Sequence, residues 1–229
     1  MRVDNIAVNK HPIRGAFRFA ARLTPRAGCG RMKQKGGGDV NKREMKKIKA
    51  HFDRYFEQKD CMVLHPIGNS GLHIDVLLYT PTERYPFWKL ATLGASDYKM
   101  PEHFPTISRF NEYIMFVDPS IDLNNKEIAK WYRDKLVMVA SYAYENKCHI
   151  TFEHSFEWKN ESDDDDKVGA FVLFPELIDD VKVLRCKTGF RKTVACLEVV
   201  LLNNGELEML KEMGPQGFWQ NYWYPPIEE

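Results

Sequence analysis

The sequence predicts an α+β fold, with a mixed, largely antiparallel sheet packed with helices. Several short segments alternate apolar and polar residues and follow one another across brief turns, as the strands of antiparallel sheets do. Two longer segments repeat apolar residues every three or four positions, which is typical of amphipathic helices. Because the strands are grouped and the helices stand apart from them, an α+β arrangement is favoured over alternating β and α units.

Charge divides the 229-residue chain into two parts. Residues 1–38 carry nine Lys or Arg and one acidic residue, Asp4, so residues 39–229 hold a formal charge of −7 against a total of +1. We expect 1–38 to be a basic, disordered leader with a glycine linker at its end, and 39–229 to form a single domain. A transit peptide, a basic arm for nucleic acid, and sequence upstream of a start at Met32 are alternatives for the leader. The acidic domain itself is not expected to bind nucleic acid, because phosphate backbones need clustered cations.

The cysteines and the hydropathy pattern indicate where the protein works. The number of cysteines is odd and no two have C-x-x-C spacing, which predicts reduced thiols in a cytoplasmic protein. No apolar run approaches the about 18 residues that a membrane helix needs, so no membrane partner is expected. The five cysteines are Cys29, Cys61, Cys148, Cys186 and Cys196.

The first half of the domain is expected to hold a helix over residues 41–58 and strands over 72–79, 87–94 and 111–117. Asn41 and Glu44 have the spacing of a capping box at the helix start. In the first strand, apolar residues alternate from Leu72 to Leu78. This alternation places His73 and Asp75 on the other face, where we expect polar side chains to meet water.

The second half is expected to hold a long helix over 125–146, short strands within 149–156, 170–176, 181–186 and 193–202, and a helix over 205–213. Asn124 and Glu127 again have capping-box spacing. The long helix has a continuous apolar stripe, which predicts that it packs on the sheet. Trp131 lies on that stripe and is expected to pack in the core.

Two groups of residues could carry metal or catalytic chemistry. His73 and Asp75 point to the same face of a strand and could hold a metal ion together. Cys148, His149 and His154 lie within seven residues of one another, although structural zinc sites usually have a second cluster. An enzyme or metal-binding protein that uses one of these groups is the alternative hypothesis.

The stronger expectation is that the protein is not an enzyme and has neither a cofactor nor a metal. The sequence contains no phosphate-binding loop, dinucleotide fingerprint, nucleophile elbow or zinc-protease motif. The acidic loop that includes Asp163–Asp166 lacks the alternating ligands and the glycine of a calcium-binding EF-hand. We therefore predict no catalytic residues.

The segment from Leu72 to Pro101 resembles the suppressor of fused family. In that family, a strand with an I-D-V-like core leads into a proline-bearing turn, and an aromatic strand then ends in a G-x-S-D segment. The matching positions are the turn Pro81–Pro86, the aromatics Phe87 and Trp88, and the segment Gly94–Asp97. Further matches are Glu112 in RFNEYIMFV, the helix from Trp131, the strand GAFVLFPE and the segment VACLEVVLLNNGELEML. Ala95 departs from the pattern, because a larger apolar residue is commoner there.

The resemblance implies a suppressor-of-fused-like domain that binds or sequesters another protein. The chain is similar to the single-lobe bacterial type, which implies an immunity protein that neutralises a toxin domain. Asp97 matches the family's partner-binding aspartate, and Tyr98 and Trp88 are predicted contacts by adjacency. Tyr and Trp are enriched in protein interfaces, and an acidic domain suits a cationic partner. The predicted partner site is therefore Asp97, Tyr98 and Trp88.

Overall fold

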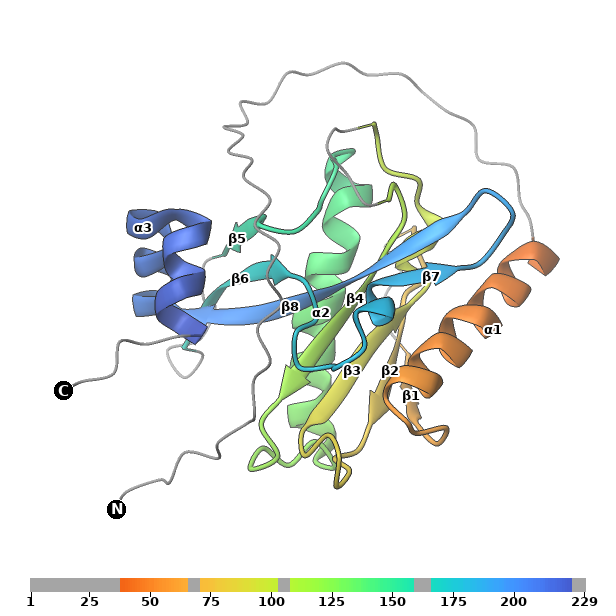
Figure 1. Ribbon diagram of the computed structural model, residues 1–229, viewed down its shortest axis with the longest axis horizontal. Helices are drawn as coiled ribbons and strands as arrows, with labels where there is room; N and C mark the ends of the chain where they lie inside the picture. Colours follow the sequence, from red (N-terminus) through yellow and green to blue (C-terminus); the bar gives the residue numbers. More distant parts are fainter. Residues whose placement is uncertain (1–37, 66–70, 103–107, 159–165, 224–229) are drawn as a thin grey trace. The chain divides into compact units, whose positions relative to one another are not determined.

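The computed structural model describes residues 38–65, 71–102, 108–158 and 166–223, and this part of the chain folds into one sheet with helices on both faces (Figure 1). Except for Gly38, the expected basic leader lies outside the described residues. The predicted acidic loop falls mostly outside them as well. The prediction of an α+β fold with a mixed, largely antiparallel sheet is confirmed.

The sheet has eight strands in the order β1-β2-β3-β4-β8-β6-β5, and β7 also pairs with β8. Every pair is antiparallel except β4 with β8, which is parallel. The strands are β1 (Met62–Leu64), β2 (Asp75–Tyr79), β3 (Trp88–Leu93), β4 (Asn111–Val117), β5 (Ser155–Glu157), β6 (Lys167–Leu173), β7 (Arg185–Lys187) and β8 (Thr193–Asn203). The helices are α1 (Gly38–Tyr55), α2 (Lys126–Asn146) and α3 (Asn204–Trp223), with short 3-10 helices η1 (Ala95–Asp97) and η2 (Val181–Leu184).

Helices α1 and α2 cover opposite faces of the sheet, so the strands β2, β3 and β4 are buried on both sides (Figure 1). Because successive strand residues point to opposite faces, Val76 packs towards Leu136 of α2, whereas Leu77 packs towards Phe52 of α1. The expectation that the face carrying His73 and Asp75 meets water is therefore wrong for most of β2. Helix α1 covers it, and Tyr79 on that face is fully buried.

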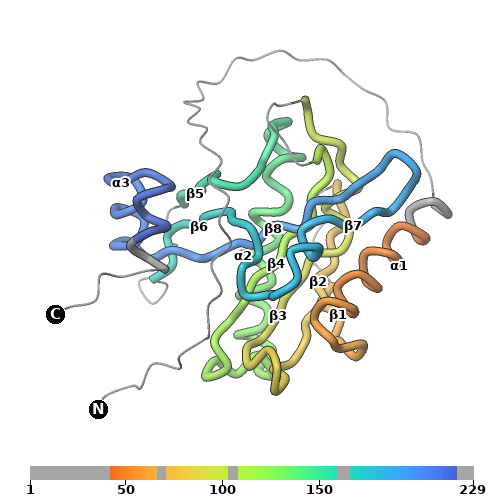
Figure 2. Tube along the Cα trace, viewed as in Figure 1, coloured from red at the N-terminus to blue at the C-terminus, as the bar shows by residue number. Residues whose placement is uncertain are grey.

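The long strand β8 connects the two ends of the sheet. Its first residues pair with β7 beside the N-terminal half of α1 (Figure 2), where Lys192 Nζ lies 2.6 Å from Glu44 Oε2. Its last residues pair with β6 and lead directly into α3. A third apolar cluster, which includes Leu207 and Phe218 of α3, covers this end of the sheet.

Most expected elements lie where the sequence predicts them, and β4 has the predicted bounds. Residues 181–184 are an exception, because the Asp180 side chain accepts a hydrogen bond from Lys182 N and turns the chain into η2 instead of a strand. The predicted helix 205–213 continues as α3 beyond Gly214, whose φ of 70° marks a kink. No helix in the described ranges is long and apolar enough to cross a membrane.

Candidate protein-binding site

The turn that follows β3 is built around the carboxylate of Glu112 on β4. Oε1 accepts hydrogen bonds from Gly94 N at 3.0 Å, Ser96 N at 3.1 Å and Ser96 Oγ at 2.7 Å. Oε2 accepts from Thr92 Oγ1 at 2.6 Å and Ala95 N at 3.3 Å. Residues Gly94–Ser96 of the turn and Glu112 of the RFNEY segment, which are separate in the sequence, thus form one buried network.

Gly94 is required at the start of this turn. Its φ is 120°, a conformation that residues with a side chain rarely adopt. A Cβ at this position would lie 2.3 Å from the carbonyl oxygen of His73. The glycine therefore lets the backbone pass close to the segment before β2 while its N–H points at Glu112.

Glu112 is completely buried and every one of its five hydrogen-bond partners donates. Burial raises the pKa of Glu112, while the hydrogen bonds from Thr92, Ser96 and Gly94 act in the opposite direction. An ionised carboxylate can only accept hydrogen bonds, so surroundings that consist entirely of hydrogen-bond donors suit the ionised form of Glu112. The negative charge thus fixes three consecutive backbone N–H groups and, with them, the shape of the turn.

The outer side of the same turn presents polar and aromatic groups. Asp97 is exposed, and the half-buried Tyr98 ring meets Tyr144 of α2 edge-on, with 5.5 Å between the ring centres. Lys147 Nζ lies 3.8 Å from the centre of the Tyr144 ring and 5.4 Å from that of Tyr98. We call Asp97, Tyr98, Tyr144 and Lys147 the rim.

Lys147 is placed at the rim by the end of α2. It is the C-cap of the helix, has left-handed backbone geometry with φ of 53°, and its N–H donates to Ala143 O. Sequence reasoning missed both Tyr144 and Lys147 as site residues. The apolar pattern predicts the end of α2 well, but it does not show that this end faces the turn after β3.

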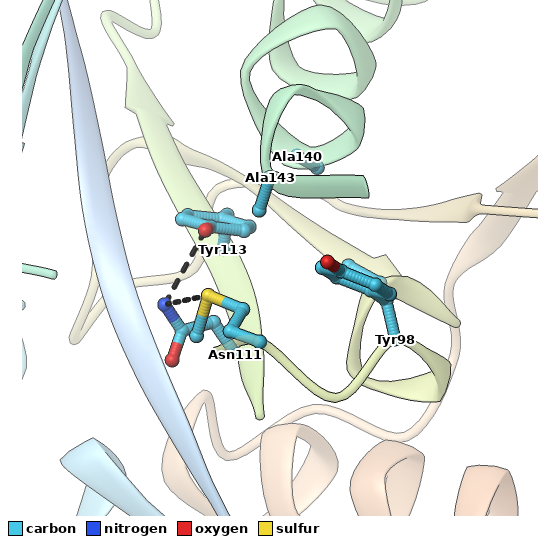
Figure 3. A pocket seen from close by; sticks show the side chains of 7 residues that line it. Tyr98, Asn111, Tyr113, Ala140 and Ala143 are labelled. Carbon is cyan, nitrogen blue, oxygen red and sulfur yellow. Dashed lines mark hydrogen bonds between the residues drawn. The ribbon is translucent and has the colours of Figure 1, made fainter. Parts of the chain in front are cut away.

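A small hollow opens beside Tyr98, between the turn and α2 (Figure 3). Tyr98 and Tyr113 lie on two sides of it, and Ala140 and Ala143 of α2 face it. Asn111 Nδ2 at its wall donates to Ile150 O at 2.7 Å and to Tyr113 Oη at 3.3 Å. The hollow has room for about one water molecule. It is therefore too small to enclose a small-molecule ligand, but a side chain on the surface of a partner protein could lie against it.

Trp88, the third predicted contact, lies in the core between the sheet and α2 and is 6% exposed. Its indole N–H has no hydrogen-bond partner among the described residues. This burial leaves Asp97 and Tyr98 as the predicted contacts that a partner can reach in this conformation. Trp131, expected in the core, is half-buried and packs against the same cluster.

The residues of the alternative metal hypothesis are not themselves part of the rim. His73 and Asp75 do come together, and His65, which sequence reasoning missed, joins them. His149 instead contacts Pro101 O at 3.2 Å, and His154 Nδ1 accepts a hydrogen bond from Thr151 N at 3.0 Å. Among the described residues, the His65 cluster is the one group of three or more metal-ligating side chains, so Cys148, His149 and His154 do not form one.

Comparisons with known proteins are consistent with one family. The family model described as "Suppressor of fused protein (SUFU)" matches residues 71–227. A SUFU homologue from Neisseria gonorrhoeae is similar in structure, with a TM-score of 0.57, 12% identity, and 84% of this chain and 93% of that chain covered. No curated protein matches the chain.

Two further solved structures have the same fold. The Sufu–Fu complex has a TM-score of 0.54 and 18% identity, with 77% of this chain and 82% of that chain covered. Drosophila Suppressor of Fused has a TM-score of 0.55 and 18% identity, with 78% of this chain covered. The alignment covers 46% of the Drosophila chain.

Proposed function

Because the chain belongs to the suppressor of fused family, we propose that it works by binding another protein at the rim rather than by catalysis. One of the similar structures is a complex of Sufu with Fu, and that complex supports a protein as the ligand class. The observation that carries the proposal is the turn locked on Glu112, which holds Asp97 and Tyr98 at the surface.

The composition of the rim suits protein recognition. Tyr98 and Tyr144 offer large, rigid surfaces, and aromatic residues are enriched in interface hot spots. Asp97 and Lys147 place both signs of charge beside these rings. Because the buried hydrogen bonds fix the turn beforehand, a partner does not have to order it on binding, which favours affinity.

The proposed partner is a toxin domain that this protein neutralises by sequestering it in the cytoplasm, as an immunity protein does. The formal charge of −7 on residues 39–229 supports a cationic partner. Toxins that attack nucleic acid are of this kind, because they need cations to bind phosphate. Growth arrest by the partner alone, relieved when this chain is expressed with it, would support the immunity role.

The contact is tested with Asp97→Arg. The partner is first captured from the native host with the full chain, identified, and purified. Its dissociation constant is then measured by calorimetry for the wild type and the variant. We expect Asp97→Arg to weaken the complex at least about tenfold, since like charges now face each other. The melting temperature of the variant is measured alongside, so that a loss of affinity can be told from a loss of folding.

Asp60→Arg is the matched control, because Asp60 is an exposed aspartate that follows α1, on the other side of the sheet from α2. It makes the same charge change and is expected to keep wild-type affinity. Equal affinities for Asp97→Arg and the wild type would remove Asp97 from the site. Equal weakening by both variants would show that only the overall charge matters.

A further inference from the structure

A cluster of three metal-ligating side chains, none of them a rim residue, lies at the start of β2. His65 follows β1, His73 lies just before β2, and Asp75 is the first residue of β2. His65 Nδ1 lies 2.8 Å and His73 Nε2 lies 3.0 Å from the same Asp75 Oδ1. All three ligand atoms lie within 4.8 Å of one another.

We propose that His65 Nδ1, His73 Nε2 and Asp75 Oδ1 bind a divalent transition-metal ion, zinc first of all, with water at the remaining position. This site goes beyond the proposed binding of a protein and does not depend on it. Two imidazole nitrogens and one carboxylate oxygen form a ligand set that zinc commonly takes.

The geometry needs only a small adjustment to accept the ion. Ligand atoms about 2.1 Å from a tetrahedral zinc ion lie about 3.4 Å from one another. The two nitrogen–oxygen distances of 2.8 and 3.0 Å are those of hydrogen bonds and would lengthen by a few tenths of an ångström. The ion would take the place of the hydrogen-bond protons, and each neutral ring would carry its proton on the other nitrogen.

The backbone around the ligands is held in place before any ion binds. Leu64, next to His65, pairs with Val76, and Asp75 pairs with Leu93. The carbonyl oxygen of His65 accepts a hydrogen bond from Arg133 Nη1 at 3.0 Å. The Arg133 charge is itself paired with Asp134 at 2.6 Å, which limits its repulsion of a cation. Asp75 lies on a paired strand and His65 directly follows one, so the backbone of these two ligands has little freedom to lose on binding an ion.

One side of the cluster is open to solvent. The side chains of His65 and His73 are 70% and 67% exposed, whereas that of Asp75 is 12% exposed. An ion can therefore reach the cluster, and water or a ligand from another molecule can complete its coordination. Bound metal would tie the end of the edge strand β1 to the start of β2.

Titration of untagged full-length protein with zinc chloride tests the site. We expect one ion to bind per chain and the melting temperature to rise with zinc concentration. His73→Ala is expected to weaken binding at least about tenfold, because even the loss of an outer-sphere partner costs that much. His149→Ala, which removes a histidine outside the cluster, is the matched control and should bind like the wild type.

Cobalt gives an independent readout, because a tetrahedral cobalt ion absorbs visible light strongly. The wild type and His149→Ala are expected to show this band, and His65→Ala and His73→Ala to lose it. Both substituted histidines are exposed, and unchanged circular dichroism will show that the variants fold. Failure of the wild type to bind zinc, or equal binding by His73→Ala and the wild type, would overturn the proposal.

Discussion

Two buried glutamates lie on the neighbouring parallel strands β4 and β8, and their surroundings differ. Glu112 accepts five hydrogen bonds, all from the turn after β3 and from Thr92. Glu198 accepts one among the described residues, from Glu176 N at 3.3 Å. Both side chains are almost completely shielded from solvent. Burial raises the pKa of Glu198 to about 8, and the Glu176 charge adds to this.

The difference in hydrogen bonding shows which of the two carboxylates helps to shape the surrounding backbone. A buried charge is costly unless hydrogen bonds compensate for it. At Glu112 the compensating groups are backbone N–H groups, so the same bonds that satisfy the charge also shape the turn carrying Asp97 and Tyr98. Glu198 lacks such a set, and its protonated form is favoured instead. A buried carboxylate with several backbone donors therefore indicates a region whose shape matters.

Removing the Glu112 carboxylate should have the largest effect. Glu112→Ala leaves three buried N–H groups and two hydroxyls without their acceptor, and we expect it to destabilise the protein by about 4 kcal/mol. Glu112→Gln keeps one oxygen and can retain the bonds of Oε1, so it should cost less. Urea unfolding monitored by tryptophan fluorescence measures both. Equal losses would mean that charge, not the set of bonds, is what stabilises the turn.

Gly94→Ala should disturb the same hydrogen-bond network by straining the backbone of the turn. The new Cβ would lie 2.3 Å from His73 O, at a φ of 120° that alanine avoids. We expect a loss of about 3 kcal/mol from this strain. Gly189→Ala is the control, because a Cβ there meets nothing closer than 3.7 Å and φ is not in the left-handed region. A cost at Gly94 no greater than that at Gly189 would contradict the role given to the turn.

The sequence predicted the strands and helices better than it predicted the site. Local alternation placed β4, and the family resemblance singled out Asp97 and Glu112 separately. Their connection depends on β3 and β4 pairing side by side, which no local pattern encodes. His65 was missed for the same reason, because the pairing of β1 with β2 brings it to Asp75. The burial of β2 could not be predicted either, since only the packing of α1 covers its second face.

Glu198→Gln should have the smallest effect when it is measured near pH 5, and the size of its effect depends on pH. The folded pKa is about 8, above the ordinary 4.5, so between these values the folded protein holds a proton that the unfolded chain has released. Stability from this group is therefore lost as pH rises through that window. Glutamine cannot ionise, so the variant should gain stability over the wild type near pH 8 and little near pH 5. Paired melting curves at the two pH values measure this, and a gain that is the same at both would show that Glu198 does not titrate in this window.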